Sequence, residues 1–376
     1  MSATTGEWPP KCHENPDTAL VVNQGVEQPP IINPYIKNFF KKKPALLSVE
    51  EYMAGITSGN TTILSQAITL VESNLPAHRD VAQKIIAACQ EHCVKSGIKS
   101  MRIGITGVPG AGKSTFIEAF GSFITSKGHK LAVLAIDPSS EKSKGSILGD
   151  KTRMETLCND PNAFIRPSPS AGSLGGVARK TRETVILCEA AGFDVVFIET
   201  VGVGQSETAV HSMSDFFLLL MLSGAGDDLQ GIKRGIMEMS DMIAITKADG
   251  NNVEKASMAR ALYANALHLF PPTESTWVPT ALTSSSVTKE GLPEILEKIE
   301  EYFTLVKGNG YYERKRREQA RFWMYESINE SLKNSFYENP TIEKLMADYE
   351  AAVLEGKLES FIAAGELLEK YRNLNK

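Results

Sequence analysis

The sequence predicts an α/β protein with a mostly parallel sheet, and two observations carry the prediction. From Met101 onward, short and almost wholly apolar runs alternate with helical segments, as in sheets that helices cover on both faces. The segment GVPGAGKST, residues 107–115, directly follows the first run and opens a helix, which is the spacing of a phosphate-binding loop. Together they predict a nucleotide at the carboxyl ends of the strands.

Six apolar runs are the expected strands. The first five are nearly continuous in apolar residues, which indicates strands that are buried on both faces, and the last mixes apolar residues with threonine and serine. The runs occupy residues 101–106, 130–137, 193–200, 215–222, 241–246 and 277–285.

Helical periodicity precedes the first strand. Ser48 is followed three residues later by Glu51, a capping box that predicts a helix start. Two more amphipathic helices are expected over 61–73 and 78–93, with Pro76 between them.

A chain of 376 residues exceeds one ordinary domain, and its character changes along its length. The first segment contains several prolines and lacks periodicity, which predicts an irregular extension. The charged segment from Tyr311 is too long for another crossover helix, so we expect it to project from the core. The expected parts are an extension at 1–44, a helical domain at 45–98, a nucleotide-binding core at 99–308 and a helical arm at 309–376.

The composition is that of an ordinary globular protein, with 42% hydrophobic and 23% charged residues. A net charge of −5 argues against non-specific binding to nucleic acid or to an anionic membrane. The longest apolar run, Phe216–Leu222, is far shorter than the ~20 residues of a membrane span. Five scattered cysteines, and an acidic N-terminal part without arginine before Arg79, favour a cytoplasmic protein.

Cys89, His92 and Cys93 stand at i, i+3 and i+4, a spacing that brings side chains together on a helix. Metal binding by these three residues is one interpretation. We favour the other, in which they are ordinary core and surface residues.

The phosphate-binding loop is the strongest signal in the chain. In such a loop backbone N–H groups wrap the phosphates, and the helix N-terminus adds its positive end. Lys113 is expected to reach the β- and γ-phosphates, and the Ser114 hydroxyl to bind Mg²⁺. The residues of the loop are Gly107, Val108, Pro109, Gly110, Ala111, Gly112, Lys113, Ser114 and Thr115.

The tetrapeptide TKAD, Thr246–Asp249, follows a late strand and predicts GTP over ATP. The Asp249 carboxylate can accept hydrogen bonds from two neighbouring guanine N–H groups, and adenine offers no such pair. Lys247 can lay its aliphatic stem along the base. The loop after the last strand is expected to touch the base through Ser285, Ser286 and Val287.

Acidic residues near strand ends predict the magnesium and γ-phosphate contacts. Glu199 ends a strand, and Gly202 follows where its N–H can sense the γ-phosphate. Val203 stands where Ras-like proteins have the glutamine that orients water, so we expect slow hydrolysis until another group completes the site. Asp137 and Asp150 are further candidates to support Mg²⁺, directly or through water.

Several segments together resemble the MeaB/ArgK-type GTPases, the chaperones associated with methylmalonyl-CoA mutase, whose human relative is the cobalamin A-type protein. The resemblance runs from about Ser48 to Lys376 and leaves residues 1–44 unmatched. The segments that carry it are, in order, GVPGAGKST, AIDPSS, GDKTRM, FIRPSPS, LGGVARKTRE, IETVGVGQSE, SGAGDDLQGIKRGI and TKADG.

The resemblance implies a homodimer of the SIMIBI class of P-loop GTPases, with helical extensions at both ends and the C-terminal arms forming the dimer. It implies a GTP-hydrolysing chaperone that gates adenosylcobalamin delivery to an acyl-CoA mutase, most directly methylmalonyl-CoA mutase, and that protects and reactivates the mutase. The mutase in turn accelerates hydrolysis. GTP, GDP and Mg²⁺ are the expected ligands, and neither nucleic acid nor a membrane is an expected partner.

The resemblance also assigns roles to residues. Its Mg²⁺ group is Ser114, Asp137, Asp150 and Glu199, and its catalytic group begins with Lys113, Glu199 and Gly202. The segment Ser223–Gly235 matches the loop called switch III, which passes between nucleotide and mutase; its candidates for completing catalysis are Asp227, Gln230 and Lys233. Without the resemblance, Lys233 would be interpreted as a solvated charge. Thr246 is a departure, since many GTPases have asparagine there, but threonine can still hold the loop by hydrogen bonding.

Three other functions are alternatives. A nickel-type metallochaperone GTPase needs a His-rich tract or a Cys-Pro-Cys motif, and the six histidines are not clustered. A small-molecule kinase needs a base beside the γ-phosphate and would leave TKAD unexplained. A non-catalytic GTP switch differs from the chaperone only in rate. The client also stays open, since isobutyryl- and hydroxyisobutyryl-CoA mutases would use similar chaperones.

Overall fold

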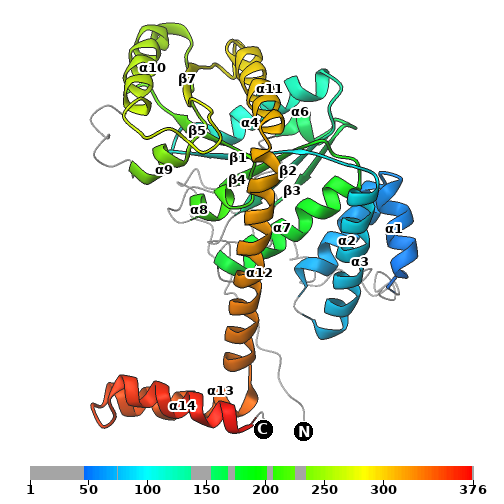
Figure 1. The fold of residues 1–376 in the computed structure, drawn as a ribbon, viewed down its shortest axis with the longest axis vertical. Helices are drawn as coiled ribbons and strands as arrows, with labels where there is room; N and C mark the ends of the chain where they lie inside the picture. Colours follow the sequence, from blue (N-terminus) through cyan, green and yellow to red (C-terminus); the bar gives the residue numbers. More distant parts are fainter. Residues whose placement is uncertain are drawn as a thin grey trace, which may run out of the picture. The chain divides into compact units, whose positions relative to one another are not determined.

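The computed structural model describes residues 46–73, 75–136, 154–167, 174–200, 206–224 and 234–374. The chain divides into two units, Met1–Leu47 and Ser48–Lys376, and the architecture below is that of the second. Figure 1 labels its helices and strands.

A seven-stranded sheet forms the centre of the unit, and every strand pair in it is parallel. The strand order is β3-β2-β4-β1-β5-β6-β7, which places β1 in the middle (Figure 1). This confirms the predicted parallel α/β fold. The strands are β1 (Met101–Gly107), β2 (Leu131–Ile136), β3 (Ala163–Arg166), β4 (Val195–Thr200), β5 (Phe216–Met221), β6 (Met242–Ile245) and β7 (Thr280–Thr283).

The edge strand β3 corrects the predicted strand count from six to seven. It has four residues and pairs with β2. Only Phe164 of the four is fully buried, so β3 lacks the continuous apolar run that marks the inner strands. Each of the six predicted runs overlaps one of the other strands, and β1 extends one residue beyond its run.

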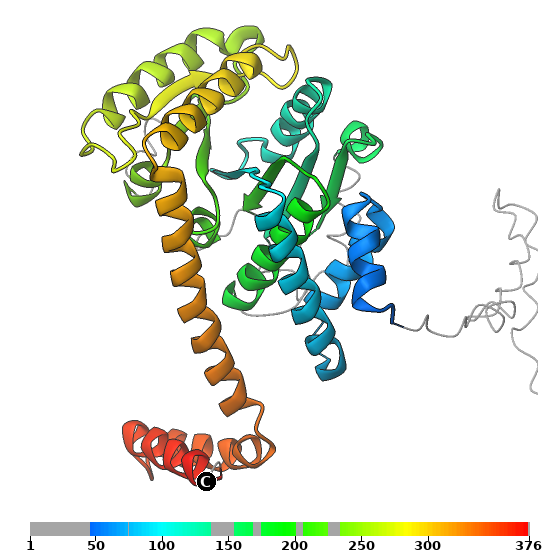
Figure 2. The same cartoon turned by 45° about the vertical axis from the view of Figure 1, so that its right-hand side comes forward.

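Helices cover both faces of the sheet (Figures 1 and 2). Leu218 and Leu219, neighbours on β5, belong to the two different hydrophobic clusters, because successive side chains of a strand point to opposite faces. One face carries α4 (Lys113–Ser126), α6 (Glu155–Cys158) and α11 (Leu292–Gly308). The other carries α7 (Leu174–Ala190), α8 (Ser206–His211), α9 (Arg234–Met239) and α10 (Val253–Leu267).

Three aspartates close the amino edge of the sheet in the same way. Each stands directly before a strand, and its carboxylate accepts a hydrogen bond from the backbone N–H at the start of the neighbouring strand. These N–H groups lie beyond the regular ladder and would otherwise need another partner. The pairs are Asp194 with Lys130 N at 2.7 Å, Asp215 with Arg102 N at 3.0 Å, and Asp241 with Phe217 N at 2.9 Å.

Asp215 is also part of a buried cluster of ion pairs. Arg316 of α12 (Tyr311–Tyr337) donates hydrogen bonds of 2.9 and 2.7 Å to its carboxylate. Arg102 donates two of 2.8 Å to Glu189 on α7. Burial alone would raise the pKa of Asp215, but the Arg316 guanidinium holds that pKa below its ordinary value. Burial instead raises the pKa of Asp241, against the opposing charge of a lysine on α12.

The N-terminal helices α1 (Val49–Thr57), α2 (Thr61–Glu72) and α3 (Pro76–Lys95) pack against α7. The predicted capping box is present: Ser48 Oγ accepts from Glu51 N, and the Glu51 carboxylate accepts from Ser48 N. Pro76 is the first residue of α3 rather than part of the linker, because a proline there removes no helical hydrogen bond. At the end of α2, Glu72 pairs with Arg166 of β3.

The C-terminal helices begin with α12, which leads from the sheet to α13 (Pro340–Leu354) and α14 (Ser360–Leu374) (Figures 1 and 2). Besides Arg316, several side chains anchor its first half, among them Tyr312, which donates to the Ser100 carbonyl, and Lys315, which donates to the Asp215 carbonyl. Gln319 donates to the Ser214 carbonyl at 2.8 Å, and Trp323 donates to the Ser212 carbonyl at 3.2 Å. Its last turns pack instead against α13 and α14.

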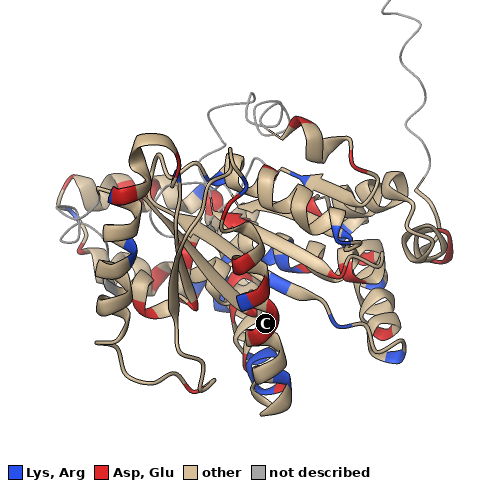
Figure 3. Ribbon diagram, turned by 90° about the horizontal axis from the view of Figure 1, so that it is seen from above, with Lys and Arg blue, Asp and Glu red and all other residues tan. Residues whose placement is uncertain are grey.

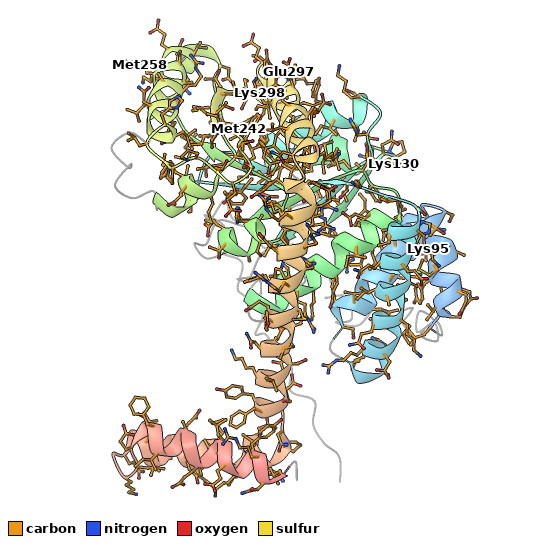
Figure 4. The ribbon with its side chains drawn as sticks, in the orientation of Figure 1. Lys95, Lys130, Met242, Met258, Glu297 and Lys298 are labelled. Atoms are coloured by element: carbon orange, nitrogen blue, oxygen red, sulfur yellow. The ribbon has the colours of Figure 1, made fainter. Side chains whose placement is uncertain are left out.

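Charges of both signs are interspersed over the described helices (Figure 3). Lys298, for example, pairs with Glu301 at 2.6 Å one turn further along α11. Met258 projects from the outer side of α10 and is 74% exposed (Figure 4). No helix within the described residues combines the length and apolarity needed to cross a bilayer.

Replacing Asp215 with asparagine is expected to destabilise the fold far more than the same change at Asp241. Asp215→Asn leaves Arg316 buried without its full counter-charge, at a cost of ~3 kcal/mol. Asp241→Asn keeps an acceptor for the strand N–H and removes a charge that burial disfavours. Thermal midpoints at pH 7 measure both, and equal losses would contradict the difference.

The pH dependence follows from the lowered pKa of Asp215. Its stabilisation is complete above the ordinary aspartate pKa of about 3.9 and is lost as the pH falls through the lower folded-state pKa. The difference between the wild-type protein and Asp215→Asn should therefore shrink only in strong acid.

Candidate nucleotide-binding site

The phosphate-binding loop joins β1 to α4, as the sequence predicts. Gly110 and Gly112 have φ of 81° and 79°, a left-handed conformation that glycine adopts without strain. Gly112 is the N-cap of α4 and brings no side chain, so the first amides of the helix are left for an anion. A Cβ on Gly107 would lie 2.5 Å from the Leu220 carbonyl oxygen, which explains why β5 can approach the loop so closely.

Lys113 curls back over the loop. Its Nζ donates to the Gly107 carbonyl at 3.1 Å. Burial lowers the pKa of Lys113, while the nearby carboxylates of Glu199 and Glu207 act against that shift. Glu199 is buried in β4, in register with Ile105 of β1. The Lys113 ammonium group and the Glu199 carboxylate are therefore neighbours at the phosphate-binding loop.

Thr246 joins the TKAD segment to the phosphate-binding loop. Its hydroxyl lies 2.7 Å from the Ala111 carbonyl oxygen and 3.1 Å from that of Met221. The next residue, Lys247, has its Cε 3.7 Å from where a Cβ on Gly112 would stand. The lysine stem therefore lies against the phosphate-binding loop, and the threonine does hold the segment by hydrogen bonding.

Asp249 is oriented by Ser285. The Ser285 hydroxyl donates to Asp249 Oδ2 and accepts from Val287 N at 3.2 Å and Thr288 N at 3.1 Å. Ser285 is buried, Ser286 is half-buried and Val287 is exposed. Within this loop the structure thus brings Ser285 to the carboxylate that is expected to read the base.

Sequence reasoning missed two residues of this region. Gly291 has φ of 79°, and a Cβ there would lie 2.0 Å from the Thr283 carbonyl oxygen, so only glycine closes the loop after β7. A glycine between an expected strand and a helix is a sequence pattern that could have indicated this turn. Asn252 bonds to Lys247 and to Ser223, and nothing in the sequence marks these partners.

The remaining site candidates divide into two groups. Ser114 is half-buried in the first turn of α4, and Thr115 beside it is exposed. Val108 is half-buried and Pro109 is exposed. The others lie outside the described residues: Asp137, Asp150, Gly202, Asp227, Gln230 and Lys233.

Of the two cysteines of α3, Cys89 is buried and Cys93 is half-buried. Burial raises the pKa of Cys89 to about 12 and that of Cys93 to about 11, so both thiols stay protonated near neutral pH. Throughout the described ranges, no three His, Cys, Asp or Glu side chains gather as a metal site would require.

Comparison with known proteins gives a consistent result. The family model described as "Methylmalonyl Co-A mutase-associated GTPase MeaB" matches residues 64–341. A "Putative GTPase" of Caulobacter vibrioides is 47% identical over 325 residues, covering 86% of this chain and 98% of its own. The mouse protein "Methylmalonic aciduria type A homolog, mitochondrial" is 43% identical over 331 residues, covering 86% of this chain and 80% of its own.

A solved structure agrees in fold. The crystal structure of a "LAO/AO transport system kinase" superposes with a TM-score of 0.67 at 35% identity, covering 87% of this chain and all of that one (100%). The shared fold extends well beyond the phosphate-binding loop.

Asp249→Asn is expected to reverse the base preference. The amide cannot accept two N–H groups from guanine, but its NH₂ can donate to the C2 carbonyl of xanthine. GTP affinity should fall by ~10²-fold, the scale of a charge-assisted pair of bonds, while xanthosine triphosphate affinity rises. Titration with fluorescent nucleotides measures both, and unchanged GTP-over-ATP selectivity would sink the assignment of Asp249.

Proposed function

The chain belongs to the MeaB family of methylmalonyl-CoA mutase-associated GTPases, and on that premise we propose that it is a chaperone of an adenosylcobalamin-dependent acyl-CoA mutase. In this proposal it gates delivery of the cofactor to the mutase, protects the mutase and reactivates it. Methylmalonyl-CoA mutase is the proposed client. The observation that carries the proposal is the family match over residues 64–341, because that family is named for its mutase.

The site supports GTP hydrolysis that depends on Mg²⁺. Ser114 and Glu199 offer oxygen ligands beside the phosphate-binding loop, and a hard cation prefers oxygen. When bound, the ion would neutralise charge on the β- and γ-phosphates, and Lys113 would add its own charge. Asp137 and Asp150 lie outside the described residues, and we propose that both support the ion, directly or through water.

Slow basal turnover and stimulation by a partner are proposed from the residue that follows Gly202 in the sequence. Val203 occupies the place of the water-orienting glutamine of Ras-like proteins. We propose that Asp227, Gln230 and Lys233 complete the site when the mutase docks, and that Gly202 senses the γ-phosphate. The nucleotide then changes affinity for the mutase, and linkage requires the mutase to change nucleotide affinity by the same factor.

The arm is proposed to form a homodimer. A hollow of about 700 Å³ lies between the end of α12, α13 and α14, and its lining is mostly apolar. Nearby Leu354 and Phe361 are 88% and 84% exposed. Apolar side chains gathered at the end of a helical arm are what a matching arm of a second copy would cover. The parts at 1–44, 45–98, 99–308 and 309–376 are proposed as the extension, helical domain, GTPase core and dimerisation arm.

Stimulation by the client tests the chaperone proposal. GTP and ATP turnover would be measured with methylmalonyl-, isobutyryl- and hydroxyisobutyryl-CoA mutase and with none. We expect slow hydrolysis of GTP only, rising ~10²-fold or more with the client, the scale on which a docking partner acts. Lys233→Ala should keep the basal rate and lose the stimulation. If none of the three mutases stimulates turnover, the chaperone proposal is wrong and the GTPase assignment stands.

Light scattering tests the dimer. Leu354→Glu combined with Phe361→Glu should convert a two-copy particle into a single copy, because a buried, unpaired carboxylate is costly. Glu369→Gln, at another exposed position of α14, is the control and should leave the mass unchanged. A particle of unchanged mass in the double variant would reject the arm as the interface.

A further inference from the structure

Asn252 has two side-chain hydrogen bonds that join separate parts of the nucleotide site. It ends the short 3₁₀ helix Gly250–Asn252 that follows TKAD. Its Nδ2 donates to the Lys247 carbonyl at 2.7 Å. Its Oδ1 accepts from the Ser223 hydroxyl at 2.5 Å, just beyond the end of β5. Both polar ends of one amide are thus used, each toward a different loop.

The Lys247 backbone needs such support. Its φ of 58° is left-handed, a conformation that costs a residue with a Cβ roughly 1–2 kcal/mol. Two hydrogen bonds hold the peptide group on its carboxyl side. Asn252 binds the Lys247 carbonyl, and the following amide, Ala248 N, donates to the Ser284 carbonyl at 3.0 Å. With its backbone fixed, the Lys247 stem lies beside Gly112 of the phosphate-binding loop.

Ser223 supplies the second anchor. It follows β5, whose Leu220 carbonyl packs against Gly107 in the phosphate-binding loop. Because Ser223 donates to Asn252, the amide is held in the orientation that turns its NH₂ toward Lys247. A freely rotating amide would satisfy the Lys247 carbonyl only part of the time.

We propose that Asn252 is a positioning residue for guanine specificity: it holds Lys247 in the left-handed conformation that lays the lysine stem along the base. It acts through Lys247 and contacts no nucleotide atom in this assignment. The inference rests on the proposed GTP site but not on the mutase. Measurements of nucleotide binding can therefore refute the role of Asn252 while the chaperone proposal stands.

Nucleotide affinity separates this role from a merely structural one. Asn252→Ala should weaken GTP binding about tenfold, the ratio that one hydrogen bond of ordinary strength carries, and ATP binding much less. Asn252→Asp should behave like the alanine variant, since a carboxylate accepts from Ser223 but cannot donate to the Lys247 carbonyl. Asn251→Ala, at the exposed neighbouring position, is the matched control and should bind normally.

A double-mutant cycle with Lys247→Gly gives the decisive readout. Glycine adopts a positive φ without strain and has no stem to place, so Asn252 should have nothing left to position. Asn252→Ala should then add no further loss of GTP affinity in the Lys247→Gly protein. Additive losses, or equal loss of GTP and ATP affinity in Asn252→Ala, would overturn the proposal. Matching thermal midpoints establish that the variants are folded.

Discussion

All seven strands of the sheet run in the same direction, and this constraint decides where binding and anchoring take place. Parallel strands present every amino end at one edge and every carboxyl end at the other. The amino edge is closed by Asp194, Asp215 and Asp241, together with the ion pairs of Arg102 and Arg316. The carboxyl edge holds Glu199 of β4 and the loops after β1, β6 and β7, which carry the described part of the candidate nucleotide site.

The phosphate and base sides of the site form one connected unit. Thr246 bonds to the Ala111 carbonyl inside the phosphate-binding loop, and the Lys247 stem lies against Gly112 of the same loop. Ser285 orients Asp249 from the loop after β7. The base side and the phosphate side of the site are therefore joined by the Thr246 hydrogen bond and by the packing of Lys247.

The sequence predicts best those features whose cause is local. Inner strands such as β5 are continuous apolar runs, and the phosphate-binding loop needs glycines at Gly110 and Gly112 for reasons contained within the loop. β3 was missed because a short edge strand is only partly buried and carries no such run. Asn252 was missed because Ser223 comes from a distant part of the chain, and only the fold brings the two together.

Strand β5 connects the arm to the nucleotide site. At its amino end, Asp215 receives Arg316, and the residues just before it receive Gln319 and Trp323, all from α12. At its carboxyl end, Leu220 packs on the phosphate-binding loop and Ser223 bonds to Asn252. A strand hydrogen-bonded on both sides in the middle of a sheet does not bend readily. The first half of α12 is therefore fixed relative to the nucleotide site. Glu330, further along α12, still pairs with Arg179 of α7 at 3.2 Å, so any change in the angle of the arm must arise beyond Glu330.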